Sequence, residues 1–197
     1  PVIYMFSASL MDRSDVFSTP IRVFPSSTRW QNYSDIFSRF DLQVFLVNSL
    51  IVASSVILLN MFFCTLTGYS LAKFKYPGRK LAFYFILATM MVPTTVIVIP
   101  LYLTVLRLGW INTYRALIIP TAITPFGVFL MRQFILTIPD DYIEAARIDG
   151  CSEVRIFRTM ILPLCKPALS ALGIVVFVAE WNSFLWPLVV VSQRRYK

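Results

Sequence analysis

Two long stretches without a charged residue constrain this chain more than any other feature of its sequence. No Asp, Glu, Lys or Arg occurs between Asp41 and Lys73, and none occurs between Lys80 and Arg107. A helix needs roughly 20 apolar residues to cross about 30 Å of hydrocarbon, and each stretch is longer than that. Charged residues make up 14% of the chain, against about 25% in an ordinary soluble domain. The sequence therefore predicts an integral membrane protein.

The order of apolar and polar stretches predicts a bundle of membrane-spanning helices in a single transmembrane domain. We expect complete spans at about residues 43–66, 81–105, 114–135 and 164–189. The ten residues at the start are apolar but too few to cross a bilayer, so we expect them to be the tail of a span that begins before this chain. Residues 11–40 are mixed and polar, which is typical of an extramembrane loop. Prolines such as Pro93 and Pro120 are tolerated inside spans, usually with a kink.

The basic residues fit a membrane setting better than a nucleic-acid partner. The net charge is +8, but the lysines and arginines lie in short loops beside apolar runs rather than on one basic face. Membrane lipid is the expected partner of such loops, and no nucleic acid is expected. Alternation of the spans places the loop 73–80 on the same side as the segment 137–163. The dense positive charge of the 73–80 loop favours the cytoplasm for that side.

Several kinds of chemistry are excluded by what the sequence lacks. It contains no histidine, which rules out Ser-His-Asp triads and HExxH zinc sites. Cys64, Cys151 and Cys165 form no CxxC pair, so neither a zinc site nor a disulfide framework is expected. No G-x4-GK[ST] phosphate-binding loop occurs. We therefore expect no cofactor, no metal and no catalytic residue, and a membrane enzyme or sensor is disfavoured.

An acidic segment between the third and fourth spans departs from the apolar pattern. Half of the chain's 10 acidic residues lie between Asp140 and Glu153. Asp140 or Asp141 can cap a helix that begins after Pro139, and Asp141 and Glu144 have the spacing of a capping box. Acidic residues in this first turn also suit the helix dipole. We expect a short helix here that is too charged to cross the membrane.

A second short helix is predicted directly after the first. Gly150 can end the first helix in a left-handed turn, and Ser152 can cap the second. Val154, Phe157 and Ile161 then form an apolar stripe at helical spacing, and Pro163 breaks this helix before the last span. Two interpretations remain open on these grounds: a loop that only connects spans, or an element on which another protein docks. In the docking hypothesis, the small Ala145 and Ala146 allow close approach of the partner.

The stretch "EAARIDGCSEVRIFRTMILP" resembles the loop that defines permease subunits of bacterial ABC importers, with the pattern EAA-x3-G-x9-I-x-LP. Its fixed positions are matched except one, where Met160 replaces the usual Ile and keeps an apolar side chain. The stretches "NSLIVA", "MMVPTTVIVIPLY", "LGWINTYRALIIP", "FGVFLMRQF" and "WNSFLWPLVV" extend the resemblance over nearly the whole chain, to the maltose-type sugar permeases.

The resemblance implies a fold, a location and partners. The fold is all-α, a polytopic helical bundle of the type I importer permease kind with six spans, of which this chain would hold the end of the first through the fifth. The location is the bacterial cytoplasmic (inner) membrane. The expected partners are a pair of ATP-binding subunits that hydrolyse ATP, a second and non-identical permease subunit, and an extracytoplasmic solute-binding protein. The residues expected to couple this subunit to the ATPase are Glu144, Ala145, Ala146, Asp149, Gly150, Phe157, Leu162 and Pro163.

The last span contains the candidate residues for the solute pathway. Glu180 is a carboxylate within an apolar run, and such groups usually face a bundle interior or a water cavity. Trp181 can stack on sugar rings and Asn182 can bond hydroxyls, with Asn48 in the first complete span as a further candidate. Alternatively, Trp181 is an interfacial aromatic and Glu180 lies among headgroups. We expect the solute to be a sugar; the alternative is glycerol phosphate or another polyol-like solute.

Overall fold

The computed structural model describes residues 1–39 and 41–192, and the secondary structure of this part of the chain is helical. Contacts between residues divide the chain into two compact units, residues 1–47 and 48–197. A single domain was expected from the sequence.

The first unit holds one short helix where the tail of a span was expected and two within the segment expected to be a loop. Helix α1 covers Val2–Ser9, α2 covers Arg13–Val16 and α3 covers Gln31–Arg39. The Asp12 side chain caps α2 by accepting a hydrogen bond from the Arg13 amide at 2.6 Å. The Asn32 amide donates to the carbonyl oxygens of Ser9 and Met11, at 3.0 Å each. These helices depend on local caps and loop contacts, which a search for long apolar runs does not detect.

Helix α4, Leu42–Lys73, is the one described helix that is long and apolar enough to cross a membrane unaided. It extends beyond the predicted end at residue 66 because its last two turns carry smaller and more polar residues that face other helices. Gly68 and Tyr69 lie in this extension and are buried. At its end, the Arg79 guanidinium donates to the Phe74 carbonyl at 2.8 Å and satisfies an acceptor that the helix leaves open.

Three further apolar segments are bent rather than straight, and with them up to four spans are possible. Two of the bends lie within a predicted span. The third lies where the predicted segment 137–163 meets the last predicted span. The first segment joins α5 (Arg79–Met90) to α6 (Thr94–Arg107) and is bent by 101°. The second joins α7 (Tyr114–Ile118) and a 3-10 turn η1 (Ile119–Thr121) to α8 (Pro125–Leu136) and is bent by 41°. The third joins the pieces α10 to α11 (Glu153–Leu164) to α12 (Lys166–Trp181) and is bent by 74°. Pro93 precedes α6, and Pro125 begins α8, as expected where the chain cannot continue a helix.

The remaining helices lie outside these segments. Helix α9 covers Asp140–Ile148, and α13 covers Leu185–Val190. Between α9 and α12, the chain forms α10 (Glu153–Ile156), a π-helical segment η2 (Phe157–Ile161) and α11 (Leu162–Leu164). The predicted fourth span, 164–189, is interrupted after Trp181, where α12 ends with Asn182 as its C-cap.

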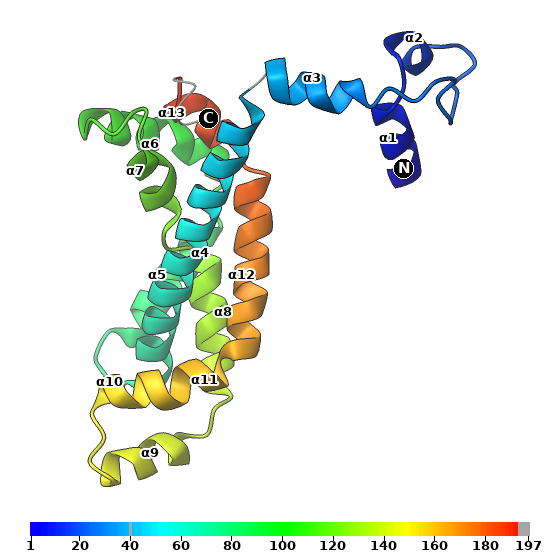
Figure 1. Ribbon diagram of the computed structural model, residues 1–197. Helices are drawn as coiled ribbons and strands as arrows, with labels where there is room; N and C mark the ends of the chain where they lie inside the picture. The colour runs from blue at the N-terminus through cyan, green and yellow to red at the C-terminus, as the bar shows by residue number, and fades with distance from the viewer. Residues whose placement is uncertain (40, 193–197) are drawn as a thin grey trace. The chain divides into compact units, whose positions relative to one another are not determined.

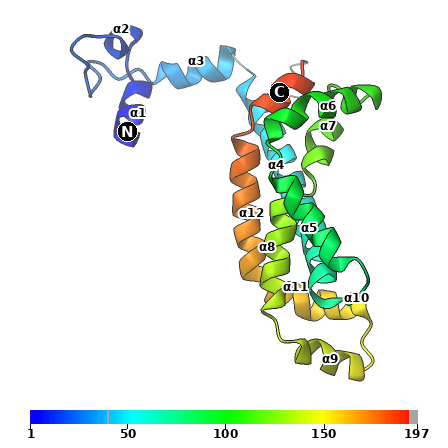
Figure 2. The ribbon, with the colours of Figure 1, turned by 180° about the vertical axis from the view of Figure 1, so that it is seen from behind.

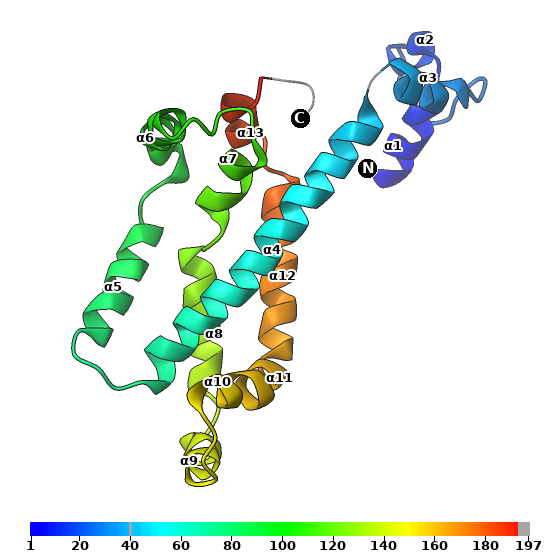
Figure 3. The same cartoon turned by 60° about the vertical axis from the view of Figure 1, so that its left-hand side comes forward.

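In the second unit, α8 and α12 lie side by side and pack against each other, and α4 meets them where it crosses them (Figures 1 and 2). Helices α9, α10 and α11 gather at one end of these three, and α6, α7 and α13 lie at the other end. Turning the molecule shows α4 crossing in front of α8 and α12 at an angle (Figure 3). Helix α5 packs against α8.

A buried asparagine joins α4 to the bend before α8. Asn60 is fully buried, and its amide nitrogen donates to the Thr121 carbonyl at 2.7 Å. Its oxygen accepts from the Thr124 amide at 3.1 Å and from the Thr124 hydroxyl at 2.8 Å. The break in the helix frees backbone groups, and Asn60 supplies partners for them, as a kinked span requires in a bilayer.

Candidate functional site

The hairpin formed by α9 through α11 has distinct inner and outer faces. Ile143 and Ala146 of α9 are buried in the main apolar core, together with Phe157 and Ile161 of the second helical piece. Glu144, Ala145, Ile148 and Asp149 are exposed, and Ile148 keeps 86% of its surface accessible. The hairpin therefore packs with one side on its own chain and leaves the other side of α9 uncovered.

Two predictions about the turn are confirmed. Gly150 adopts a left-handed conformation with φ of +75°, directly after the Asp149 C-cap of α9. Among the described residues other than its two chain neighbours, no atom lies within 4 Å of the position a Cβ would take on Gly150, so its backbone conformation, not space, favours glycine there. The Ser152 side chain caps α10 by accepting a hydrogen bond from the Arg155 amide.

Three details of the prediction were wrong. Pro139 is the N-cap of α9 and Asp140 lies inside the helix, so neither Asp140 nor Asp141 caps it through a side chain. Ala146 is buried at 6% exposure against its own chain, so it cannot form part of an outer docking face as Ala145 can. Val154 is 66% exposed while Ile156 is buried, because the bundle covers the face of α10 that carries Ile156.

The other residues proposed for coupling occupy different environments. Phe157 lies in the core with its ring 5.5 Å from that of Tyr69, centroid to centroid. Leu162 is half-buried against the same core, and Pro163 is exposed within α11. Phe157 and Leu162 therefore support the hairpin from its core side rather than forming its outer face.

The first of two polar connections ties α9 to the end of α4. The Lys73 ammonium contacts the Asp140 carboxylate at 2.6 Å and also donates to the Ile138 carbonyl. Only 5% of the Lys73 side chain is exposed, against 68% of that of Asp140. The hydrogen bond from Lys73, reinforced by its charge, holds the pKa of Asp140 below its usual range. The loop 73–80 and the acidic segment, predicted to share one side of the membrane, thus touch each other.

The second connection passes through Glu153, at the start of α10. One carboxylate oxygen accepts from the Arg147 guanidinium at 2.7 Å, and the other accepts from the Tyr69 hydroxyl at 3.0 Å. Glu153 therefore links α9, α10 and α4 with a single side chain. Tyr69, Lys73 and Glu153 were not predicted as site residues, since their partners lie 65 or more positions away or across the glycine turn.

At the opposite end of the second unit, a small cavity brings together three of the four residues proposed for the solute pathway. Asn48, Glu180 and Trp181 all line a cavity of about 120 Å³. Ser49, Ser183 and Trp186 also line it, and none of these was singled out as a solute contact from the sequence. The lining comes from α4, from the end of α12 and from the segment that follows, so sequence spacing alone could not reveal it.

Two of the polar groups around this cavity are already engaged. The Asn48 oxygen accepts from the Tyr114 hydroxyl at 2.6 Å, and the Trp186 indole donates to the Ala116 carbonyl at 2.9 Å. Asn182, the fourth proposed pathway residue, does not line the cavity. Its amide instead donates to the Val178 carbonyl at 2.7 Å. Among the described residues that line the cavity, Glu180 carries the charge, and lysine and arginine do not contribute.

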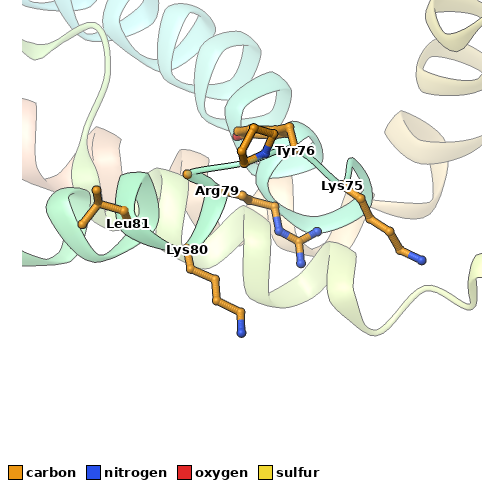
Figure 4. A pocket seen from close by; sticks show the side chains of 7 residues that line it. Lys75, Tyr76, Arg79, Lys80 and Leu81 are labelled. Carbon is orange, nitrogen blue, oxygen red and sulfur yellow. The ribbon is translucent and has the colours of Figure 1, made fainter.

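A larger and more open depression lies at the turn between α4 and α5. It has a volume of about 590 Å³ and is lined by the consecutive residues 75–81. The basic side chains of Lys75, Arg79 and Lys80 extend to one side of this turn (Figure 4). Because the depression is formed by one short run of chain around Pro77 and Gly78, it is the concave side of a turn rather than a built site.

The bent apolar segments, the straight span α4 and the charged hairpin at one end define a polytopic helical membrane protein. The sequence profile described as "Binding-protein-dependent transport system inner membrane component" matches residues 64–194. The chain belongs to this family, as its EAA-type loop had predicted.

Individual relatives agree with this assignment. The chain is 35% identical over 198 residues to the sn-glycerol-3-phosphate transport system permease protein UgpE of Pectobacterium atrosepticum, covering 98% of this chain and 70% of the relative. It is 34% identical over 194 residues to the arabinooligosaccharides transport system permease protein AraQ of Halalkalibacterium halodurans, covering 97% and 70%. A solved chain of a bacterial ABC transporter involved in the import of the acidic polysaccharide alginate has the same fold, with a TM-score of 0.89, 24% identity, and coverage of 100% of this chain and 69% of the other.

Family membership gives the protein its role and location. It is a permease subunit of a binding-protein-dependent ABC importer and a multi-pass protein of the bacterial inner membrane. It is a transport subunit, not an enzyme. Both sugar permeases and glycerol phosphate permeases are among its relatives.

Proposed function

We propose that this subunit converts ATP hydrolysis in a pair of partner subunits into the import of a neutral sugar. The exposed outer face of α9 is the observation that supports the coupling role. Glu144, Ala145, Ile148 and Asp149 share this face, which offers an acidic group, a small residue and a large apolar residue to a soluble partner. Ile148, which is 86% exposed beside these charges, is the apolar contact that this face would offer.

The mechanism is a rigid-body movement. The partner ATPases bind the hairpins of this subunit and of a second, non-identical permease. When ATP draws the ATPases together, the two hairpins move with them because each is packed on its own bundle through buried residues such as Ile143 and Phe157. The bundles then rock between inward-facing and outward-facing states around a site near the middle of the membrane. A solute-binding protein delivers the solute on the extracytoplasmic side.

The chemistry of the cavity at Glu180 supports a neutral polyhydroxylated solute. Glu180 and Asn48 can accept or donate hydrogen bonds to hydroxyl groups, and Trp181 and Trp186 present aromatic faces on which a sugar ring stacks. The volume of about 120 Å³ is below the roughly 300–1,000 Å³ of whole small-molecule sites. The cavity therefore receives only part of a sugar, and the second permease supplies the rest of the pathway.

Glycerol phosphate is the alternative solute, because the UgpE permease of Pectobacterium atrosepticum is 35% identical to this chain. A phosphate ester needs basic or amide donors around its anionic oxygens. A carboxylate beside a phosphate would instead repel it. The carboxylate of Glu180, on a lining to which no lysine or arginine contributes among the described residues, favours the neutral sugar.

Reversing the charge of Glu144 tests the coupling role. Glu144→Lys should reduce uptake to background in cells that carry the complete importer, because an acidic contact with the ATPase becomes a basic one. Gly150→Pro should do the same, since proline fixes φ near −65° where the chain requires +75°. Uptake of labelled solute and the amount of the subunit in the membrane fraction are measured together.

Lys80→Glu is the matched control. It also reverses one charge at the same end of the bundle but lies on α5, away from the α9 face, and should leave uptake near the wild-type level. Normal uptake by both Glu144→Lys and Gly150→Pro, at normal membrane levels, would remove the coupling role from this hairpin.

A further inference from the structure

Two residues of α4 face the hairpin from one helical turn apart. Tyr69 and Lys73 are separated by four positions, so they project from the same side of the helix. Tyr69 is 3% exposed, and the Lys73 side chain is 5% exposed. Both polar side chains are thus buried against the hairpin, where each has a hydrogen-bond partner from the hairpin or the segment that leads into it.

The Lys73 contact holds the beginning of α9. Its ammonium donates to the Ile138 carbonyl, just before α9, and pairs with Asp140 in the first turn at 2.6 Å. A buried ammonium that loses its partners is strongly unfavourable, because the charge can neither be hydrated nor neutralised by a neighbour. The first turn of α9 and the last turn of α4 are therefore held to move as a unit.

The Glu153 contact holds the other end of the hairpin. Its carboxylate joins the Arg147 guanidinium of α9 to the Tyr69 hydroxyl of α4. The Tyr69 ring also packs on Phe157 with 5.5 Å between ring centroids. A displacement of α9 or α10 relative to α4 would break the hydrogen bond between Tyr69 and the Glu153 carboxylate. It would also separate the Tyr69 ring from the Phe157 ring.

The backbone explains why these contacts matter. The hairpin is continuous with α8 through residues 137–139 and with α12 through Cys165, but α4 precedes it by more than 60 residues. Movement of the hairpin reaches α8 and α12 along the chain itself. It reaches α4, which crosses both of them (Figure 3), through contacts between helices, and the contacts of Tyr69 and Lys73 join α4 to the hairpin directly.

We infer that Tyr69, Lys73, Asp140 and Glu153 form a clamp that transmits the movement of the hairpin to α4, and that they are positioning residues for energy coupling. This inference rests on the proposed function, in which the ATPases dock on α9. The clamp residues do not form the docking face. They determine how much of the ATP-driven movement of the ATPases is converted into movement of the bundle.

The test uses the complete importer, with its ATPases, second permease and binding protein, reconstituted in proteoliposomes. Tyr69→Phe removes one hydroxyl and keeps the ring that packs on Phe157, and Lys73→Met removes the ammonium but keeps an apolar stem. The measured quantity is the amount of solute imported per ATP hydrolysed, together with the amount of ATPase that co-purifies. A net hydrogen-bond contribution of about 1 kcal/mol corresponds to roughly a fivefold change in an equilibrium, so the expected loss for Tyr69→Phe is roughly fivefold.

Matched controls are Tyr76→Phe and Lys80→Met, which remove a hydroxyl and an ammonium from exposed residues at the same end of α4 and α5. Both should keep the wild-type ratio. Because Tyr69 and Glu153 share one hydrogen bond, Tyr69→Phe combined with Glu153→Gln should lower the ratio no further than the stronger single change.

Each outcome separates the clamp from the docking hypothesis. Normal co-purification and ATP hydrolysis with fewer solute molecules imported per ATP supports the clamp. An unchanged ratio in Tyr69→Phe and Lys73→Met overturns it while leaving docking intact. Failure of Tyr69→Phe to assemble also overturns it, because the residue would then act in folding rather than in transmission. If ATPase binds normally to Glu144→Lys, the docking hypothesis itself fails.

Discussion

At the scale of single residues, Asp140 carries an electrostatic contact that can be tested by pH. Its carboxylate pairs with Lys73, whose side chain is almost completely buried. Lys75 and Arg147 add weaker positive potential around it, and the result is a pKa of Asp140 below its usual range. The folded state therefore binds the proton at Asp140 less readily than the unfolded chain does.

The sign of the pH effect follows from this shift. A lowered pKa contributes stability that is present above the ordinary value of an aspartate, about 4, and is lost as the pH falls through the lower folded value. Hydrogen exchange of the α9 amides, corrected for its intrinsic pH dependence, should accelerate as the pH falls from roughly 5 to 3. Asp140→Asn should exchange faster already at neutral pH and lose this part of the pH dependence. An identical pH profile in both proteins would show that the ion pair does not anchor α9.

In the hairpin, local features could be predicted from the sequence, whereas burial and long-range contacts could not. The motif at Glu144 and Gly150 was identifiable because its chemistry is local: a helix, a left-handed glycine and a cap on Ser152. Ala146 and Val154 were misassigned because burial depends on which face the bundle covers. The clamp through Glu153 was invisible because its partner on α4, Tyr69, lies 84 positions earlier.

At the scale of helices, close packing between α4 and its neighbours depends on two glycines with different surroundings. A Cβ on Gly68 would lie 2.9 Å from the Arg132 backbone nitrogen and 3.0 Å from the Met131 Cβ, atoms that cannot move without shifting α8. A Cβ on Gly173 would lie 2.5 Å from the terminal methyl of Met61, which can rotate away. The same substitution should therefore have opposite consequences at the two positions.

Gly68→Ala should destabilise the subunit by about 1–3 kcal/mol, the usual cost of inserting a group into a well-packed interior. Gly173→Ala should be neutral or slightly stabilising, since alanine favours a helix over glycine by about 1 kcal/mol. Thermal unfolding of the purified importer, followed by the fluorescence of a thiol-reactive dye or by loss of assembly, compares the two. Equal losses would mean that α4 and α8 are not held at the spacing seen here.

The positions of the apolar segments were more predictable than the number and shape of the helices within them. Long apolar runs indicated where the chain can cross a membrane, and the prolines indicated where it cannot remain straight. The size of each bend depends on packing between segments distant in sequence, as where Asn60 binds the freed groups around Thr121 and Thr124. The sequence pattern does not indicate which distant segments pack together, so the 101° bend between α5 and α6 could not be predicted.

At the scale of the whole molecule, the charge at Glu180 should determine which solutes the assembled importer accepts. In proteoliposomes with the complete importer, uptake should be found within a panel of neutral mono- and disaccharides. An excess of sn-glycerol 3-phosphate should not compete. Glu180→Gln should reduce import of the preferred sugar about tenfold, the effect of about 1.4 kcal/mol expected when a charged hydrogen bond becomes neutral. Import of the phosphate ester in preference to every sugar would favour the alternative solute.

The buried Lys73 also has a consequence for the order in which the protein is made. Its partner Asp140 is synthesised 67 residues later. At about 5–20 residues per second, this is an interval of roughly 3–13 seconds. During that time the lysine has no carboxylate from the hairpin, so its charge must remain hydrated at the membrane surface. The last turn of α4 can adopt its final packing only after the acidic hairpin has been synthesised. The last turn of α4 and the hairpin therefore fold together in a single late step.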